Sequence, residues 1–560
     1  MRYPVNLSEP SGSRVTIDAF GGCNHTLSAG ENEFYRMENL TSDHYPMLAP
    51  RKPRQLHKEM TGCGGIIAKD ALCYVNEGVF YINDYPIDMG LTVGEKQLVS
   101  MGAWVIVLPD KKRVNTVDHT VEALEAFFTA GGTVSFLPCT LDGGELDTVV
   151  STTAPEDTTK TWIDTGASPH AMKQYSSAAE DWVSVATPYT KIAANGIGNA
   201  FSLYDGVRIS GVADASLQDL NAAHAIWGKG EDYLVVAALC PGVFTQEGAL
   251  TVSRKMPDMD FVVEHHTRLW GCKYGMVNGV AVNEIYASKL GDPKNFNCFM
   301  GIASDSQVFS CGSDGPFTGA AALDTPLFFK ENCLHRVYGD GYPFAMQVMA
   351  CNGVQSGCGK SLAVVGDTLF YKARSGIMAY DGGSSVCISR KLGSLSGNAV
   401  GGAWGEKYYL SMEDGIYVFD TARALWHRES GAGITEFCCC GDVLYGVAEN
   451  GIIAFDGGRS QVSFSAETGL IGGTDPDSKY LSRLTVRLRM APGAQLRLGL
   501  RYDGESTAEQ VADLTGRGLR SFSLPIRPRR CDYLRLILQG CGDVQVLSIT
   551  KTMEKGSALS

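Results

Sequence analysis

The sequence has little charge and no long apolar run. Only 19% of its 560 residues are charged, and no window reaches the roughly 18 consecutive apolar residues that a membrane-spanning helix needs. The opening residues, MRYPVNLSEP, lack the charged and then apolar segments of a secretory signal. We therefore expect no membrane span and no export by the usual signal.

The sequence also lacks the paired CxxC spacings of zinc modules, although it contains 17 cysteines. The number is odd, and Cys438, Cys439 and Cys440 are consecutive within an apolar run, where successive strand side chains point to opposite faces. Buried free cysteine behaves as a small hydrophobic residue. We predict free thiols made in a reducing cytoplasm, with no metal site and no cofactor.

Net positive charge is absent as well, which argues against general nucleic-acid binding: the formal charge is −13. The charge is unevenly spread, because residues 479–560 carry +7, which leaves −20 on residues 1–478. A basic C-terminal module on an acidic body predicts an electrostatically steered contact between subunits or with a neighbour. A basic face that is merely solvated is the alternative.

A repeat in the second half of the chain predicts the fold. Three segments align without gaps, at spacings of 39 and 36 residues: AVVGDTLFYKARSGIMAYDGG, GAWGEKYYLSMEDGIYVFDTA and CCCGDVLYGVAENGIIAFDGG. Each has a Gly-Asp/Glu turn at Gly366, Gly405 or Gly441, followed ten residues later by a second glycine turn. Three or four short strands per roughly 40 residues are typical of a β-propeller blade.

The domain organisation follows from this repeat and from weaker copies of it at residues 65–84, 101–118, 267–290 and 326–339. We predict an all-β chain with a propeller of about seven blade-like units, six or eight being alternatives because the closing blade often takes strands from both ends. The predicted parts are an extended N-terminal arm (1–55), the first blades (56–118), an inserted mostly-β domain (119–257), the remaining blades (258–460) and a C-terminal β-sandwich (462–560). Within the insertion, the spacing of TVEALEAFFTAGG predicts one helix at 120–132.

Two motifs resemble catalytic or binding loops. SGCGKS at 356–361 resembles the end of a phosphate-binding loop, but Val354 stands where that motif needs glycine and a strand pattern follows, so we interpret Lys360 as a solvated turn residue. DTGAS at 164–168 copies an aspartic-protease loop around Asp164, but only one copy exists. A β-turn is the favoured interpretation.

Three further motifs do not indicate a catalytic, cofactor or metal site. Glu264, His265 and His266 are adjacent, and neighbouring strand residues point to opposite faces, so a strand-edge polar patch is favoured over a metal site. GSDGPFTG at 312–319 weakly resembles the Asp-box turn of sialidases, without its tryptophan and without repeats. RPRRCD at 527–532 either binds nucleic acid or an acidic partner, or is a loop with solvated arginines. We therefore assign no catalytic, cofactor-binding or metal-binding residue.

Several segments together resemble the β-propeller nozzle, or tail-stabilisation, proteins of short-tailed bacteriophages. The segments are FGGCNHTLSAGENEFYRMENLTSDHYPMLAPRKPR near the N-terminus, RLWG with NEIYASKLGDPKNF, SGIMAYDGG with SRKLG, and LPIRPRRCDYLRL. Their shared order along the chain, outside the insertion, carries the resemblance. The large insertion departs from it and is an alternative host-recognition or fibre-docking module.

The resemblance implies a non-enzymatic tail or head–tail subunit of the virion. Such proteins assemble into homo-oligomeric rings, often hexamers, below the portal and adaptor proteins, where DNA passes without specific binding. An acidic surface fits such a channel because it repels phosphate. Two alternatives are a tail protein that binds host-surface glycans in a groove with exposed Trp or Tyr, and a glycan-cleaving propeller with two carboxylates about 5–10 Å apart.

Overall fold

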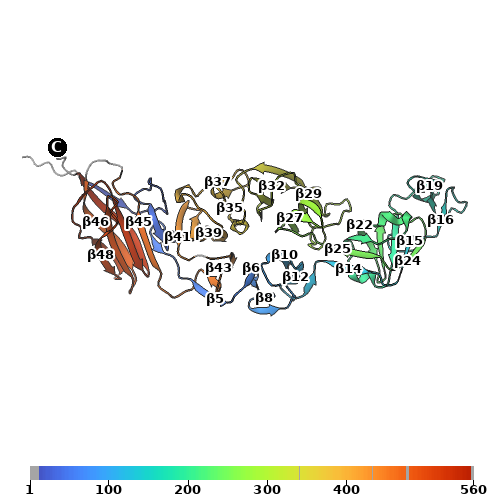
Figure 1. Ribbon diagram of the computed structural model, residues 1–560, viewed down its shortest axis with the longest axis horizontal. Helices are drawn as coiled ribbons and strands as arrows, with labels where there is room; N and C mark the ends of the chain where they lie inside the picture. The colour runs from blue at the N-terminus through green and yellow to red at the C-terminus, as the bar shows by residue number, and fades with distance from the viewer. Residues whose placement is uncertain (1–11, 340, 432, 474–478, 517, 556–560) are drawn as a thin grey trace, which may run out of the picture.

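Regular structure in this chain is almost entirely β, as predicted. The computed structural model describes residues 12–339, 341–431, 433–473, 479–516 and 518–555 (Figure 1). Within these ranges the helices are four short 3-10 turns: η1 (Ile197–Ala200), η2 (Ala215–Leu220), η3 (Gly359–Ser361) and η4 (Arg390–Leu392). The long axis of the molecule carries three bodies in series, with the C-terminal strands at one end and the inserted strands at the other (Figure 1).

The middle body, which we call the seven-sheet body, consists of seven four-stranded antiparallel sheets. The first three are β6 (Cys63–Lys69), β7 (Ala71–Asn76), β8 (Val79–Ile82) and β9 (Tyr85–Ile87); β10 (Gln97–Met101), β11 (Trp104–Leu108), β12 (Lys112–Asn115) and β13 (Val121–Ala123); and β26 (Phe261–His265), β27 (Arg268–Val277), β28 (Val280–Ala287) and β29 (Gln307–Ser310). The next two are β30 (Gly319–Ala322), β31 (Pro326–Lys330), β32 (Cys333–Tyr338) and β33 (Ala345–Ala350); and β34 (Ala363–Val365), β35 (Thr368–Ala373), β36 (Gly376–Tyr380) and β37 (Val386–Cys387). The last two are β38 (Val400–Trp404), β39 (Lys407–Met412), β40 (Gly415–Asp420) and β41 (Leu425–Glu429); and β42 (Glu436–Cys440), β43 (Val443–Ala448), β44 (Gly451–Ala454) and β5 (Gln55–Glu59).

The three repeat units form three successive sheets with the same first turn. Gly366, Gly405 and Gly441 have φ of 58°, 58° and 59°, and each begins a two-residue loop between strands in direct register. Glycine alone takes a positive φ in these loops, which is the pattern of a type II′ hairpin. The Gly-Asp/Glu step of the repeat therefore sets the register of each sheet.

The first strands of neighbouring sheets contact one another at six of the seven steps around the body, and η3 bridges the remaining step. β6 contacts β10, β10 contacts β26, and β26 contacts β30; the turn η3 then lies against both β30 and β38, with β34 beside β38. From there β38 contacts β42, and β42 contacts β6. The seventh sheet joins both ends of this segment, because β5, from residues 55–59, pairs with β44.

The helix expected at 120–132 is wrong. Residues 121–123 are strand β13, paired with β12, and β14 (Ala126–Thr129) pairs with β25. Leu124, which is fully buried, lies in a core shared with Val99, Ile106 and Phe296, whereas Phe127 is 59% exposed. Strand pairing overrides the helical spacing of the apolar residues here. The residues before Leu124 pair with β12 of the seven-sheet body, and the residues after it pair with β25 of the inserted body.

The inserted body contains twelve strands in two sheets. Eight form one sheet: β14, β15 (Thr133–Cys139), β20 (Tyr189–Ala193), β21 (Gly206–Ser210), β22 (Ala223–Lys229), β23 (Tyr233–Ala237), β24 (Phe244–Glu247) and β25 (Thr251–Arg254). Four form a smaller sheet from the β15–β20 connection: β16 (Thr148–Ser151), β17 (Thr161–Asp164), β18 (Ala171–Ser176) and β19 (Asp181–Ser184). The larger sheet encloses an apolar core of its own, which includes Val134, Phe136, Ile192 and Val236.

Two five-stranded sheets, which we call the terminal sheet pair, share one core that includes Val486, Leu488, Leu498 and Leu536. One sheet contains β1 (Gly12–Ile17), β46 (Lys479–Met490), β49 (Gly518–Ser523), β50 (Arg530–Cys531) and β52 (Val544–Lys555). The other contains β2 (Phe34–Glu38), β45 (Ser463–Thr468), β47 (Gln495–Tyr502), β48 (Glu509–Thr515) and β51 (Leu534–Cys541), and a short hairpin, β3 (Leu40–Thr41) with β4 (Ala49–Pro50), lies beside it.

The N-terminal segment differs from the extended arm predicted for 1–55. Residues 1–11 lie outside the described residues, but β1 pairs with β52 along its whole length and β2 pairs with β45. The pairing buries Ile17, Phe34 and Met37, and removing such side chains from water stabilises the paired state. Both terminal sheets therefore draw strands from both ends of the chain.

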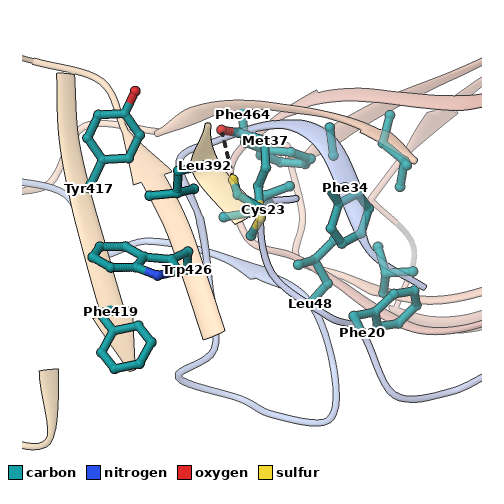
Figure 2. Packing of buried hydrophobic residues seen from close by; sticks show 14 of the residues in the cluster. Phe20, Cys23, Phe34, Met37, Leu48, Leu392, Tyr417, Phe419, Trp426 and Phe464 are labelled. Carbon is teal, nitrogen blue, oxygen red and sulfur yellow. Dashed lines mark hydrogen bonds between the residues drawn. The ribbon is translucent and has the colours of Figure 1, made fainter. Parts of the chain in front are cut away.

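A junction cluster joins this N-terminal segment to the sixth sheet (Figure 2). Trp426 of β41 lies against Phe419 at 4.8 Å between ring centroids, and its indole N–H donates to Ile388 O at 3.0 Å. Cys23 N donates to Trp426 O at 2.5 Å. This approach requires Gly22, because a Cβ there would collide with the Trp426 carbonyl.

Candidate functional site

Lys360 lies where three sheets of the seven-sheet body meet. Its Nζ is 2.7 Å from Glu95 Oε1, just before β10, and 3.0 Å from Glu436 Oε2, at the start of β42. Burial lowers the Lys360 pKa, but the two carboxylates outweigh burial and raise it above its ordinary value. Burial raises the Glu436 pKa. The turn η3 has three residues and leads into β34, so the helix N-terminus of a phosphate-binding loop is not formed here.

Asp164 ends strand β17 and organises a turn. Its carboxylate accepts hydrogen bonds from the backbone N–H groups of Gly166 and Ala167 and from Lys173 Nζ at 2.9 Å. The hydrogen bond from Lys173 lowers the Asp164 pKa. A carboxylate held by a lysine and its own loop serves the turn and is not placed opposite a second carboxylate in the manner of an acid–base pair.

The histidine pair is not split across a strand as expected. β26 ends at His265, while His266 and Thr267 form a left-handed turn with φ of 47° and 55°, and the two imidazole rings stack at 3.9 Å between centroids. The turn changes the direction of the His266 side chain, which strand alternation did not allow for. Within the described ranges, no group of three or more His, Cys, Asp or Glu could hold a metal ion.

The loop containing 312–319 lies against a buried lysine. Lys330, only 2% exposed, donates to Asn283 Oδ1 and to Ser313 O, each at 2.9 Å. Burial lowers the Lys330 pKa. In the basic run 527–532, Arg529 is paired with Glu505, and Cys531 is buried against β46.

A concave surface lies between the seven-sheet body and the terminal sheet pair. Three hollows of about 550, 550 and 410 Å³ adjoin one another there, and Ser465 of β45 lines all three. We call them together the junction groove. Its other polar lining residues include His25, Arg36, Glu38, Asp414, Arg428, Ser430, Gln495, Arg497, Arg501, Gln510 and Gln539.

Arg428 connects two carboxylates on one wall of the groove. It lies 3.8 Å from Glu38 and 4.0 Å from Asp414, and Asp414 also accepts the Tyr417 hydroxyl at 2.6 Å. The Glu38 and Asp414 side chains are 40% and 58% exposed. A glycosidase acid needs a carboxyl that burial keeps protonated, and neither of these exposed, arginine-paired groups is in such a setting.

The opposite wall is built around a buried carboxylate. Glu467, 7% exposed, lies 2.8 Å from Arg501 and 3.6 Å from Arg535. The Arg535 guanidinium lies 4.2 Å from the centre of the Tyr35 ring, which fixes it from the other side. Of these two arginines, Arg501 lines the groove, whereas Arg535 donates to Thr468 O behind it.

The distal sheet of the inserted body has an aromatic face. Trp162 and Trp182 meet edge to face at 5.7 Å, Tyr175 meets Trp182 at 5.8 Å, and Lys173 Nζ lies 4.7 Å from the Trp162 ring centre. Trp162 is buried and Tyr175 is 36% exposed. The cluster therefore consists of one covered and two more accessible aromatic rings.

The sequence motifs gave no sign of the junction groove. Its lining residues come from three separate stretches, at 25–39, 392–430 and 463–541, which are brought together by the pairing of β2 with β45 and by the contact of β2 with β41. A signal was present only in the alternation of β47, where Gln495, Arg497 and Arg501 occupy the outward positions between leucines.

No family model and no curated protein matches this chain. Among solved structures, it is similar to PorZ, a surface component of the type-IX secretion system of Porphyromonas gingivalis, at 9% identity and a TM-score of 0.25, over 82% of this chain and 70% of that one. It is also similar to the extracellular domain of BT4673 from B. thetaiotaomicron (8%, 0.24, 92% and 98%) and to an exo-β-1,3-galactanase from Phanerochaete chrysosporium (9%, 0.17, 51% and 78%). Likenesses this remote carry no argument about function.

Among the described residues, no helix is long and apolar enough to cross a membrane.

Proposed function

We propose that this chain is a non-enzymatic structural subunit of a bacteriophage tail or head–tail assembly. In this proposal the seven sheets close into a seven-bladed β-propeller, the terminal sheet pair is a β-sandwich, and the molecule is a rigid spacer between assembly contacts at its two ends. The resemblance to the nozzle proteins of short-tailed phages adds a ring, with a hexamer as the expected form, next to portal, adaptor or other tail proteins.

One observation supports the proposal: the first strands of neighbouring sheets contact one another at six of the seven steps around the body, η3 bridges the remaining step, and one sheet is made from both ends of the segment. The ion cluster of Lys360, Glu95 and Glu436 lies where β10, β34 and β42 begin. A closed stack whose central charges are paired with each other supports a scaffold more than a reaction centre.

The proposal is tested on particles. Phage particles released by the strain that carries the gene should contain this chain in a fixed copy number, measured by quantitative mass spectrometry against the major capsid protein. Purified protein should form rings visible by negative-stain electron microscopy. Particles of full infectivity that lack the chain would refute the proposed role.

A second candidate function is binding of surface glycans in the junction groove. The observation that favours it is the lining itself, in which guanidinium, amide and hydroxyl groups alternate beside Tyr417. Such donors and acceptors suit a polyhydroxylated or acidic chain. Arg497→Ala together with Gln539→Ala should weaken binding to an acidic polysaccharide at least tenfold by isothermal titration calorimetry. Arg208→Ala, on the exposed surface of β21, is the control expected to bind normally.

A further inference from the structure

The outer face of the sheet formed by β1, β52, β46 and β49 is covered by arginines. Arg14 and Arg483 flank Thr552 on neighbouring strands, and Arg487 and Arg489 continue the row along β46. All four side chains are exposed, while the alternate residues of β46, Leu484, Val486 and Leu488, are buried. This face, which we call the arginine face, also carries the hydroxyl groups of Thr16, Thr485, Thr550, Thr552, Ser521 and Ser548, and its edges include Leu519, Gln545 and Glu554.

These four arginines have no ion pair or side-chain hydrogen bond within the part of the chain that the structure describes. The other sheet of the pair is different. There each arginine of β47 and β51 has a carboxylate partner: Arg497 pairs with Asp513, and Arg501 and Arg535 both pair with Glu467. The arginine face includes one acid in register with these strands, Glu554, but its carboxylate accepts the Tyr480 hydroxyl and pairs with none of the four arginines.

Internal stability does not account for the arginine face. Like charges at neighbouring positions of a sheet are destabilising, and a flat, unpaired arginine row contributes no buried area to the core. Arginine is the side chain that binds carboxylates through two parallel N–H donors, and it is more weakly hydrated than lysine. The row is thus suited to an acidic partner surface.

We propose that the arginine face binds a second copy of this chain, at the row of acidic turns formed by Asp367, Glu406 and Asp442. This inference rests on the proposed function, because it names one contact by which subunits assemble. The chain provides its own complementary charge: residues 479–560 carry +7 and the rest carries −20.

The acidic turns form a regular counter-surface. Asp367, Glu406 and Asp442 occupy the same position of the same two-residue turn in three successive sheets, and all three are exposed. None has an ion pair within the described ranges, although Lys407, next to Glu406, is paired with Asp43. The arginine row and the acidic row lie on different bodies, so the contact is head-to-tail and closes into a ring or extends into a filament.

The contact is tested by exchanging charges between copies. Two variants are needed: Arg483→Glu with Arg487→Glu on the face, and Asp367→Lys, Glu406→Lys and Asp442→Lys on the turns. By sedimentation velocity in 50 mM NaCl, each variant alone should self-associate at least tenfold more weakly than the natural protein. A 1:1 mixture should regain association, because the reversed charges attract again across one interface. Association of the natural protein should weaken in 500 mM NaCl.

Arg208→Glu with Arg459→Glu is the matched control, since both side chains are exposed and the charge change is the same; its association should equal that of the natural protein. Association of the face variant at natural strength, a mixture that fails to regain association, or a natural protein that stays monomeric would each overturn the inference. So would loss of binding to a 30-base-pair DNA duplex with self-association unchanged, which would assign the face to nucleic acid. The copy number of the chain in phage particles tests the proposed function, and self-association of the purified protein tests this contact. A failure of one is therefore distinguishable from a failure of the other.

Discussion

At the scale of single residues, the buried charged groups of this protein are held by partners, and the informative exceptions are buried groups without them. His427 is 1% exposed, and its Nε2 has no hydrogen-bond partner within the described ranges. Burial lowers its pKa to about 3, so the folded protein holds a neutral imidazole at all but acidic pH.

His427 should make the fold sensitive to acid. As pH falls below about 6.5, His427 becomes protonated in the unfolded chain, whereas in the folded chain it stays neutral down to about pH 3. The free energy of unfolding therefore decreases progressively between pH 6.5 and about pH 3. We expect a contribution of up to about 1.4 kcal/mol per pH unit. Urea unfolding at pH 7, 6 and 5 should show a smaller loss for His427→Leu than for the natural protein. Equal losses in the two proteins would contradict the prediction.

The sequence singled out two motif residues, Lys360 and Asp164, but neither their partners nor the junction groove could be predicted from it. Lys360 and Asp164 were interpreted as turn residues and lie in turns, yet nothing in the sequence pointed to Glu95 and Glu436 as the partners of Lys360. Those contacts join segments 76 and 265 positions away, and no local pattern records such distances. The stacked histidines show the same limit, because strand alternation holds only as far as the strand extends.

At the scale of elements, turn chemistry was the reliable guide. The glycine repeat fixed three hairpins with their register, because a positive φ at the first turn position admits few residues besides glycine. The spacing of apolar residues was a poorer guide around Leu124. There β13 and β14 belong to two different bodies, and their apolar residues together have the spacing of a helix. The pairing of β1 and β2 could not be predicted from the sequence, because their partner strands lie more than 400 residues away along the chain.

The hairpin turns give a prediction at this scale. Gly405→Ala should destabilise the protein by about 1–2 kcal/mol, because an L-residue with Cβ is strained at positive φ. The space around Gly405 is open, so the cost is conformational and not steric. Gly131→Ala is the control: its surroundings are equally open and its φ is not in the left-handed region, so we expect no loss. Thermal unfolding of both variants measures the difference, and equal midpoints would contradict the assignment of the turn.

At the scale of the whole molecule, the inserted body should be separable. Its first and last strands, β14 and β25, are antiparallel neighbours, with Ala126 opposite Arg254, so its two ends emerge side by side from the seven-sheet body. The fully buried Leu124 and the nearly buried Met256 belong to the core of that body and stay with it.

Replacing residues 126–254 by a short Gly-Ser linker should therefore leave a folded protein with a strand-type circular dichroism spectrum. We expect a loss of about 1–3 kcal/mol, because buried Asn295 would lose its hydrogen bonds with Asp205 and Gly206. Calorimetry should show one fewer unfolding component than the natural protein. Aggregation of the shortened chain, with Asn295→Ser included to remove the unpaired amide, would show that the insertion is part of the central core.

The sharing of the terminal sheets between the two ends of the chain has a consequence for biosynthesis. β1 and β2 leave the ribosome well before their partners β52 and β45, which lie more than 400 residues further along the chain. At elongation rates of about 5–20 residues per second the interval is roughly half a minute to two minutes. During that time the N-terminal strands have unpaired edges, which are prone to aggregation. Production of this protein should accordingly depend on chaperones that hold nascent chains, more than its finished architecture would suggest.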